Sequence, residues 1–214
     1  MTAPPDPAAR IRALGPRVAR SRRLELGWPD RRHSAELVRL LGDPEVVRWT
    51  LRIPSPYRPR DLDAFYARTQ RYHRDGSGLS LQIVRRRDGA LLGGVGLHAI
   101  DAEHRRGVVG YWIGAPYRRR GYGLEAVRTL CAFSFRRLGL VRLQAEVFRG
   151  NRASERLLRA AGFRREGLLR GHVRKAGVAL DVVLYGRLRD DDAPPPRRRG
   201  SGTRSSAVAA TPTR

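Results

Sequence analysis

One short segment of the chain combines residue types that can bind a diphosphate. It has the sequence YWIGAPYRRRGYGLEA, in which an expected strand leads through Arg118–Gly123 into an expected helix. The start of a helix exposes backbone N–H groups that have no intrahelical partner, and the helix dipole adds positive charge there. Glycines at positions 121 and 123 would leave room for an anion beside these amides, and three arginines add attraction. The segment therefore predicts a diphosphate site made mainly of main-chain groups.

Two other phosphate-binding patterns fit the sequence less well. The nucleoside-triphosphate pattern G-x-x-x-x-G-K-[ST] is absent. Residues 94–99 match the dinucleotide pattern G-x-G-x-x-[GA] formally, but an expected strand runs through these glycines and no helix clearly follows them. That motif requires a strand, then the glycines, then a helix. We interpret the match as chance.

The turn and its surroundings resemble a known family. Arg118-x-x-Gly121-x-Gly123 is similar to the (Gln/Arg)-x-x-Gly-x-(Gly/Ala) signature of the GNAT N-acetyltransferases. The flanking residues resemble the branch that contains the RimJ and RimL ribosomal-protein N-terminal acetyltransferases. The matching blocks are Gly110-Tyr111-Trp112-Ile113, Glu125-Ala126, then Asn151, Ser154, Leu157, Gly162 and Phe163, and finally Asp181 and Tyr185. The likeness runs in order from about Arg22 to Leu188.

The resemblance implies an acetyl-CoA-dependent N-acetyltransferase without a metal ion. In the family, two central parallel strands splay apart and the pantetheine arm lies in the gap between them; here these would be residues 108–113 and 141–148. Backbone groups around Trp112 and Ile113 would pair with the pantetheine amides like an added strand, and a main-chain N–H at Ile113 would polarise the thioester carbonyl. Asn151 matches a position that contacts the cofactor arm, although it can equally be a helix N-cap. The residues expected to bind the cofactor are Trp112, Ile113, Arg118, Arg119, Arg120, Gly121, Tyr122, Gly123 and Asn151.

The resemblance is weaker at the catalytic positions. Relatives often carry a glutamate where Val108 stands here, and many carry a tyrosine acid where Leu158 stands. Ser154 aligns with a serine that is proposed to protonate the CoA thiolate, and it could also cap its helix. For the base that deprotonates the amine, the candidates are Glu146, on the polar face of its expected strand, together with His98, Glu103 or a chain of water molecules. Glu146 and Ser154 are the catalytic residues that we predict.

The amine acceptor is expected between a proline-bearing loop at residues 48–60 and a closing hairpin. Trp49, Tyr57 and Arg52 in the loop could contact it, as could His172 and Tyr185 in the hairpin. For Trp49 the alternative is core packing, because large aromatic side chains are mostly buried. Acidic residues are sparse, which argues against polycationic acceptors. We favour a protein or peptide N-terminus slightly over a small-molecule amine.

The order of the expected elements predicts an α/β fold. A strand near Leu24, two helices and three antiparallel strands precede the turn, with Asp88-Gly89 as a tight turn between two of these strands. A helix ending at Gly139, a strand, a short helix and a hairpin follow it, and in that strand the apolar residues Val141, Leu143, Ala145 and Val147 alternate with more polar ones. We expect a single GNAT-type domain with a mixed, mostly antiparallel twisted sheet, splayed central parallel strands and flanking helices. It would span residues 21–189, between a disordered lead-in at 1–20 and a disordered basic tail at 190–214.

Composition limits the function further. The formal net charge is +24, but 43 of the 44 basic residues are arginine, which is typical of a GC-rich genome as well as of polyanion binding. With one cysteine and no paired histidine spacing, the sequence predicts neither a disulfide nor a zinc site. No apolar run could cross a bilayer, so we expect a cytoplasmic protein. Weak nucleic-acid contact through the tail and a homodimer remain open, as do two alternatives to catalysis: a basic RNA- or ribosome-binding protein, and an acyl-CoA sensor.

Overall fold

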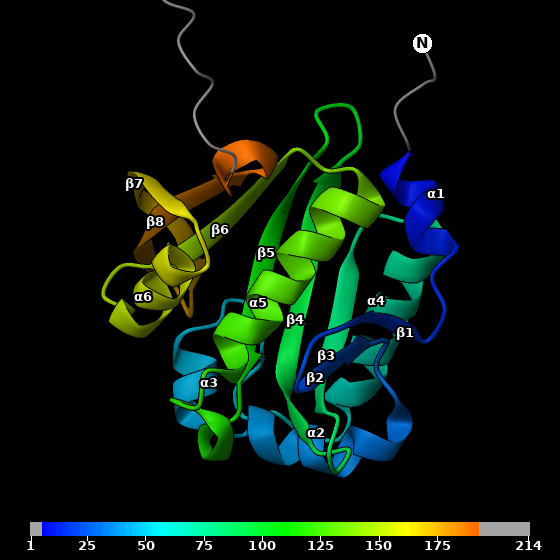
Figure 1. Ribbon diagram of the computed structural model, residues 1–214. Helices are drawn as coiled ribbons and strands as arrows, with labels where there is room; N and C mark the ends of the chain where they lie inside the picture. The colour runs from blue at the N-terminus through cyan, green and yellow to red at the C-terminus, as the bar shows by residue number, and fades with distance from the viewer. Residues whose placement is uncertain (1–5, 193–214) are drawn as a thin grey trace, which may run out of the picture.

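A computed structural model describes residues 6–192 and has an eight-stranded sheet at its centre (Figure 1). The strands lie in the order β1-β2-β3-β4-β5-β6-β8-β7, and only β5 and β6 are parallel neighbours. The strands are β1 Arg17–Arg20, β2 Leu24–Gly27, β3 Leu79–Arg85, β4 Leu91–Asp101, β5 Arg106–Ile113, β6 Arg142–Phe148, β7 Arg164–Lys175 and β8 Val178–Leu188. The predicted fold class, an α/β domain with a mixed and mostly antiparallel sheet, is confirmed.

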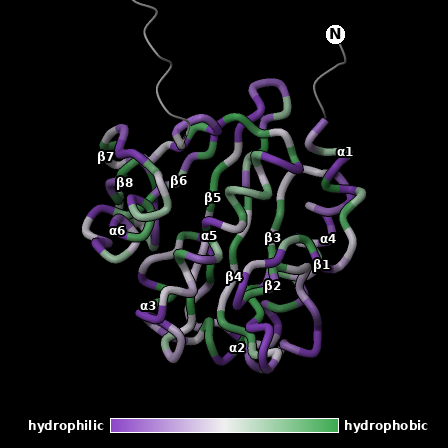
Figure 2. Tube along the Cα trace, viewed as in Figure 1, coloured by the Kyte–Doolittle hydropathy of each residue, from purple (hydrophilic) through white to green (hydrophobic). Residues whose placement is uncertain are grey.

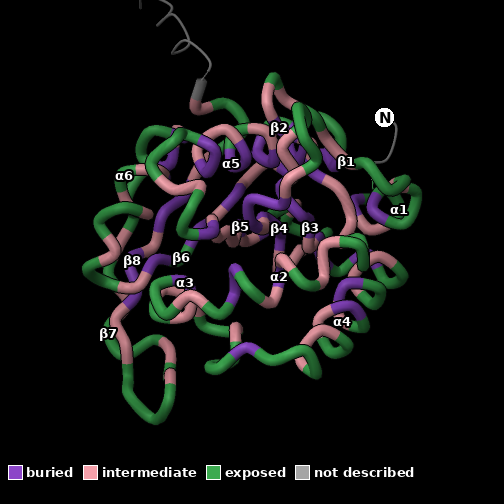
Figure 3. The backbone as a smooth tube through the Cα atoms, turned by 90° about the horizontal axis from the view of Figure 1, so that it is seen from below, coloured by how far each residue is buried: buried purple, intermediate pink, exposed green. Residues whose placement is uncertain are grey.

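Helices cover both faces of this sheet. The α-helices are α1 Pro7–Arg12, α2 Ser34–Leu41, α3 Pro44–Arg48, α4 Asp61–Asp75, α5 Tyr122–Phe133 and α6 Arg152–Ala160. Short 3-10 turns lie at Arg31–His33, Ala115–Tyr117 and Arg189–Asp192, and a π-helical turn at Ser134–Leu138 extends α5. Figure 3 shows α5 and α6 on one side of the sheet and α2, α3 and α4 on the other. The sheet therefore separates two chemically distinct surfaces.

The main core lies between α5 and the central strands. Leu130, Leu97 and Leu143 are fully buried there, since alternate residues of a strand point to the same face and an amphipathic helix covers them. Figure 2 shows the hydrophobic residues concentrated along β3, β4 and β5, whereas the trace of α6 includes many hydrophilic residues. The helix ends at Gly139, which has a φ of 78° that suits glycine. This ending agrees with the sequence prediction.

The parallel strands β5 and β6 stay paired over only three residues. Their register runs from Arg106 opposite Arg142 to Val108 opposite Gln144, and beyond this point β6 pairs only with β8. Figure 1 shows the two strands side by side where they begin and apart toward their ends. The last residues of β5 therefore lack a neighbour on the β6 side. This is the splay that the family resemblance implied.

The prediction of a disordered lead-in at residues 1–20 is wrong for residues 6–20, the part that the structure describes. Residues 6–20 form α1 and β1, and β1 pairs antiparallel with β2. Asp6 caps α1 by accepting hydrogen bonds from two backbone amides, and Ile11 is fully buried in the main core. The few apolar residues between Pro7 and Pro16 gave no periodic signal, yet the burial of Ile11 anchors the segment. Residues 193–214 of the expected tail lie outside the described residues.

Candidate active site

The turn before α5 leaves its helix end uncapped. Gly121 is the N-cap residue with a φ of 77°, and within residues 6–192 no side-chain cap bonds to the first amides of the helix. Arg119 also has a positive φ, of 58°. The side chains of Arg119 and Arg120 are exposed. An uncapped helix start that carries two exposed arginines is a site for an anion, because the free N–H groups and the helix dipole act together.

Two arginines hold the turn in place instead of facing solvent. The Nε of Arg118 donates to the carbonyl of Ile113 at 3.0 Å, and its guanidinium also pairs with Asp43 at 2.5 Å. Arg23 binds Glu125 in the first turn of α5 at 2.6 Å and donates to the carbonyl of Arg120 at 3.1 Å. The Arg118 side chain therefore supports the turn. Only the main chain of Arg118 stays available for the predicted contact with the cofactor.

Gly123 and Tyr122 serve packing as well as the turn. A Cβ added at Gly123 would lie 2.9 Å from Cδ1 of Leu157, so this glycine lets α5 approach α6 closely. The ring of Tyr122 is buried beneath the Arg23 guanidinium, 4.5 Å from its centroid. A hydrogen bond from Arg85 lowers the pKa of the Tyr122 hydroxyl. We expected both glycines of the turn to leave room for an anion. Only Gly121 is exposed, whereas Gly123 is buried against α6.

The free edge of β5 presents main-chain groups to the gap. Gly114 N–H donates to the carbonyl of Leu92, and peptide groups in an antiparallel pair alternate in direction. The N–H and C=O of Trp112 therefore face β4, whereas those of Tyr111 and Ile113 face the splay. The prediction that main-chain groups of Trp112 pair with the pantetheine arm is therefore wrong. The N–H of Ile113 does face the splay, as its predicted contact with the thioester requires. The Trp112 side chain packs against the apolar cluster around α2 and α3.

Two hydroxyl groups meet across the gap between β5 and α6. Oγ of Ser154 lies 2.6 Å from the hydroxyl of Tyr111. Asn151 caps α6 by accepting a hydrogen bond from the Ser154 amide at 3.1 Å, which is the structural alternative that the sequence left open. Burial raises the pKa of Tyr111 to about 12, so the phenol stays protonated at neutral pH. Sequence reasoning missed Tyr111 as a site residue; only its alternation with Trp112 could have indicated that it points toward α6.

The opposite face of the sheet carries the residues expected around the acceptor. Lys175 at the tip of the β7–β8 hairpin donates to the carbonyls of Val47, Arg48 and Thr50, so the hairpin and the loop do meet. Trp49 is half-buried and outside both core clusters, and its Nε1 donates to Glu45 at 3.2 Å. His172 faces Glu146, with 3.9 Å between Nε2 and Oε1.

Two predicted acceptor contacts are wrong. Tyr185 is fully buried, and its hydroxyl bonds to Glu155 and Arg159 beneath α6. Tyr57 packs in the apolar cluster around α2, and its buried hydroxyl has no hydrogen-bond partner in the described part of the chain. In both cases an aromatic ring near a loop or strand end is part of the core, which is the commoner place for such rings.

The other two candidate bases are poorly suited to the role. Glu103 is exposed in the β4–β5 turn, so the whole length of β5 separates it from the diphosphate turn. His98 is close to the splay, but burial and the nearby Arg52 and Arg68 lower its pKa to about 4. An imidazole with so low a pKa is a weak proton acceptor at neutral pH.

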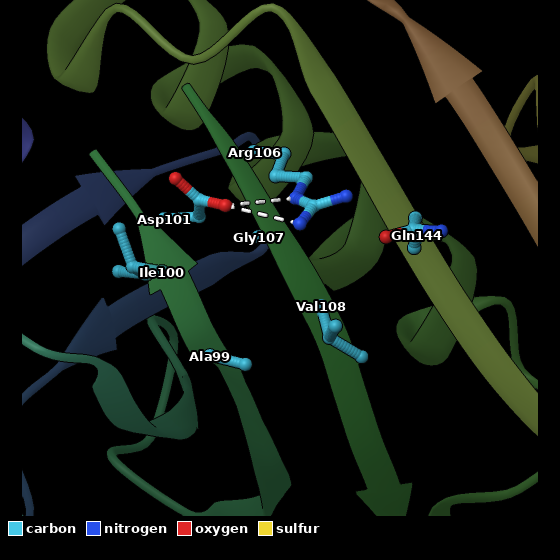
Figure 4. Close-up of a pocket in the computed structure, with 7 residues that line it drawn as sticks. All are labelled: Ala99, Ile100, Asp101, Arg106, Gly107, Val108 and Gln144. Atoms are coloured by element: carbon cyan, nitrogen blue, oxygen red, sulfur yellow. Dashed lines mark hydrogen bonds and ion pairs between the residues drawn. The ribbon is translucent and has the colours of Figure 1, made fainter. Parts of the chain in front are cut away.

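A hollow opens on the acceptor face where β5 and β6 are still paired. Its lining residues are Ala99, Ile100, Asp101, Arg106, Gly107, Val108 and Gln144 (Figure 4). Arg106 and Asp101 close one side of it through an ion pair of 3.0 Å. Val108, the position where relatives often carry a glutamate, contributes only an apolar side chain there. The hollow therefore has no base at position 108, and its one lining carboxylate, Asp101, is committed to the ion pair with Arg106.

Neither a metal cluster nor a membrane helix is found in residues 6–192. No three His, Cys, Asp or Glu side chains gather there in a way that could hold a metal ion. Within the same range, no helix has the length and apolar character needed to span a bilayer.

Comparison with known proteins assigns the family. Residues 23–164 match the acetyltransferase (GNAT) domain. The chain belongs to the GNAT acetyltransferase family. Among curated relatives, the N-acetyltransferase YoaA of Bacillus subtilis, itself uncharacterized, is 36% identical over 113 residues, which cover 53% of this chain and 64% of YoaA. The aligned part thus spans a little under two thirds of that relative.

Solved structures show the same fold. RimJ of Mycobacterium smegmatis, in complex with a CoA disulfide, superposes with a TM-score of 0.73 at 21% identity, covering 84% of this chain and 88% of RimJ. RimL, the ribosomal L7/L12 alpha-N-protein acetyltransferase, in complex with coenzyme A, gives 0.74 at 20% identity, covering 82% and 99%. The resemblance to the RimJ and RimL branch that the motifs indicated is confirmed at the level of the fold.

Proposed function

We propose that this GNAT protein transfers an acetyl group from acetyl-CoA to a primary amine. The observation that carries the proposal is the uncapped start of α5, which lies directly beyond the splayed end of β5. A diphosphate fits the uncapped helix start, and an arm that contains amides fits the free edge of β5. Acetyl-CoA contains both, joined in this order.

The fit of the cosubstrate can be described group by group. The pyrophosphate would lie on the amides of residues 119–123, with the exposed side chains of Arg119 and Arg120 beside it. The pantetheine amides would pair with the free main-chain groups of Tyr111 and Ile113, as a peptide adds to a strand edge. The N–H of Ile113 would then donate to the thioester oxygen, where negative charge develops during attack.

The expected reaction is a direct transfer. An ammonium first loses one proton to a base, and the neutral nitrogen attacks the thioester carbon, so that the C–N bond forms and the C–S bond breaks. The CoA thiolate takes a proton from the Ser154 hydroxyl, which hydrogen-bonds with Tyr111. The second proton that the nitrogen loses restores the hydroxyl pair. One proton is released to solvent per turnover.

For the acceptor, we favour a protein or peptide N-terminus. An extended chain could lie along the junction of the hairpin tip and residues 47–50, which Lys175 holds together. Acidic residues are sparse in the sequence, which argues against a polycationic acceptor. RimL, which shares the fold, is a ribosomal-protein N-terminal acetyltransferase. Nucleic-acid contact and dimer formation stay predictions.

The experiment compares two glycines of similar conformation. Gly121 and Gly89 have φ values of 77° and 72°, but only Gly121 is in the diphosphate turn. Gly121→Val and Gly89→Val should both lower the melting temperature, because valine is strained at positive φ. Acetyl-CoA should raise the melting temperature of the wild type and of Gly89→Val, since a ligand that binds only the native state stabilises it. Gly121→Val should show no such rise.

The proposed function fails if Gly121→Val keeps the acetyl-CoA shift, or if the wild type shows none. A thiol-release assay against peptides and small amines then tests transfer itself. Binding without turnover on any acceptor would favour the acyl-CoA sensor.

A further inference from the structure

The β7–β8 hairpin contains a large irregularity opposite β6. Leu169 pairs with Val182 and Val173 pairs with Leu180, so three residues of β7 lie opposite the single residue Asp181 of β8. An ordinary bulge places two residues opposite one. The extra residues, Arg170 to His172, leave the plane of the ladder. Such bulges commonly occur beside active sites, where they re-aim a side chain.

Asp181 holds this bulge in one conformation. Its Oδ1 accepts a hydrogen bond from the amide of Gly171 at 2.9 Å, and its Oδ2 pairs with Arg149 at 3.2 Å. Gly171 has a φ of 58°, a conformation that glycine adopts without strain. The hydrogen bond to Gly171, followed by the bond to Arg149, lowers the pKa of Asp181. The residue that the sequence marked as part of a closing motif thus shapes the backbone next to His172.

The bulge directs His172 toward the diverging part of β6. Nε2 of His172 lies 3.9 Å from Oε1 of Glu146, and both side chains are about 40% exposed. Glu146 is two residues beyond Gln144, the last residue of β6 that pairs with β5. It therefore stands on the flank of the splay, on the face opposite α5. At this distance the carboxylate attracts the imidazole without a direct hydrogen bond, and catalytic contacts often tighten when substrate binds.

One nitrogen of the ring remains available. Among the described residues, no hydrogen bond to Nδ1 of His172 is found. The hairpin that carries the ring is fixed at its tip by Lys175, which donates to the carbonyls of Arg48 and Thr50. The imidazole thus lies between the acceptor loop and the splay with one nitrogen toward a carboxylate and the other uncommitted.

We propose that His172 is the base that accepts the proton of the amine, and that Glu146 orients its ring. The inference rests on the proposed acetyl transfer and names the missing base of that reaction. The ammonium N–H gives its proton to Nδ1, the imidazolium is stabilised by Glu146, and the proton then passes to solvent. Within residues 6–192, the ion pair recorded for the ring is with Glu146 from β6. Asp181 from β8, opposite the bulge, is itself paired with Arg149, and Arg170 also lowers its pKa. Asp181 is a positioning residue.

The test removes the imidazole and uses a second histidine as the control. His172→Gln should lower kcat/KM for the amine by about 100-fold or more, the scale of general-base catalysis, without changing the acetyl-CoA melting shift. His104→Gln is the matched control: His104 is also exposed and also lies beside a carboxylate, Asp101, at 3.1 Å, but in the distant β4–β5 turn. It should leave kcat/KM unchanged.

Two further readouts separate a base from a structural residue. Imidazole added to His172→Ala should restore part of the lost rate, because it can occupy the vacated space and accept the proton. The rate of His172→Gln should rise with pH in parallel with the free-base fraction of the amine, so that the deficit shrinks at alkaline pH. Asp181→Asn should show a smaller loss of kcat with the same pH profile as the wild type.

The proposal is overturned if His172→Gln matches His104→Gln, or if its deficit is constant with pH and imidazole restores nothing. These outcomes differ from failure of the proposed function, in which the wild type itself shows no acetyl-CoA shift or no turnover.

Discussion

The hydroxyl pair of Tyr111 and Ser154 gives the sharpest prediction about the departing thiolate. Tyr111→Phe removes one oxygen and leaves the ring that packs against the core. The lost hydrogen bond is short, 2.6 Å, and a net hydrogen bond is worth about 1 kcal/mol of unfolding free energy. For a domain of this size, that cost corresponds to a fall in melting temperature of about 2–4 °C. Stability should therefore change little.

Activity should change more than stability. If the pair supplies the proton to the CoA thiolate, Tyr111→Phe and Ser154→Ala should each lower kcat by about 100-fold, the lower end of the range for general acid catalysis. Because the pKa of Tyr111 is raised to about 12, the phenol stays protonated from pH 7 to 10, and the effect should be the same across that range. The acetyl-CoA melting shift should be retained in both variants.

The double variant decides whether the two hydroxyls act together. Residues that act as one unit are strongly non-additive, so Tyr111→Phe with Ser154→Ala should be no slower than the slower single variant. Single-turnover measurements of thiol release report the step directly. If the losses of kcat multiply in the double variant, the two hydroxyls have independent roles. An unchanged kcat in Tyr111→Phe would refute the idea that Tyr111 and Ser154 protonate the thiolate together.

Three further predictions concern stability and the acceptor. Tyr57→Phe should raise the free energy of unfolding by about 1 kcal/mol in a denaturant titration, because it removes a buried hydroxyl that has no partner among the described residues. Burial raises the pKa of Tyr57 to about 12, above its value in the unfolded chain. The free energy of unfolding that depends on this neutral phenol is therefore fully present below pH 10 and is lost as pH rises to 12. Tyr57→Phe should lose less stability than the wild type over that window. Lys175→Met should raise KM for a peptide acceptor with the acetyl-CoA shift intact, as it frees the hairpin from the loop. The pKa of His98 is lowered to about 4, so its contribution to stability is present above pH 6.5 and lost as pH falls to 4; His98→Phe should flatten this acid dependence in thermal melts.

The parts of the fold with strong local signals could be predicted from the sequence. The Asp88-Gly89 turn, the helix that ends at Gly139 and the alternating strand from Leu143 to Val147 agree with the structure, because each pattern is set by neighbouring residues. The N-terminal strand could not be predicted, since β1 has no fully buried residue and is ordered by pairing with β2. Long-range pairing leaves no local periodicity.

The site divides in the same way. The uncapped turn at Gly121 follows from local glycine and helix signals, and it could be located from residue types alone. Which aromatic residues are core and which are exposed depends on packing, so Tyr185 and Tyr57 were misplaced. The approach of His172 to Glu146 depends on a bulge that only the register of β7 and β8 reveals.

The alternation of strands explains how one sheet can handle two protons separately. Tyr111 on β5 points toward α6 and contacts Ser154. On β6, successive side chains point to opposite faces of the sheet. Because Ala145 and Val147 pack under α5, Glu146 lies on the other face. A thioester held in the splay would therefore have a hydroxyl donor on one face and the Glu146–His172 pair on the other. The amine would approach from the second face while the thiolate leaves toward the first. The hydroxyl pair and His172 would thus supply, from other positions, the acid and the base that relatives carry where Leu158 and Val108 stand here.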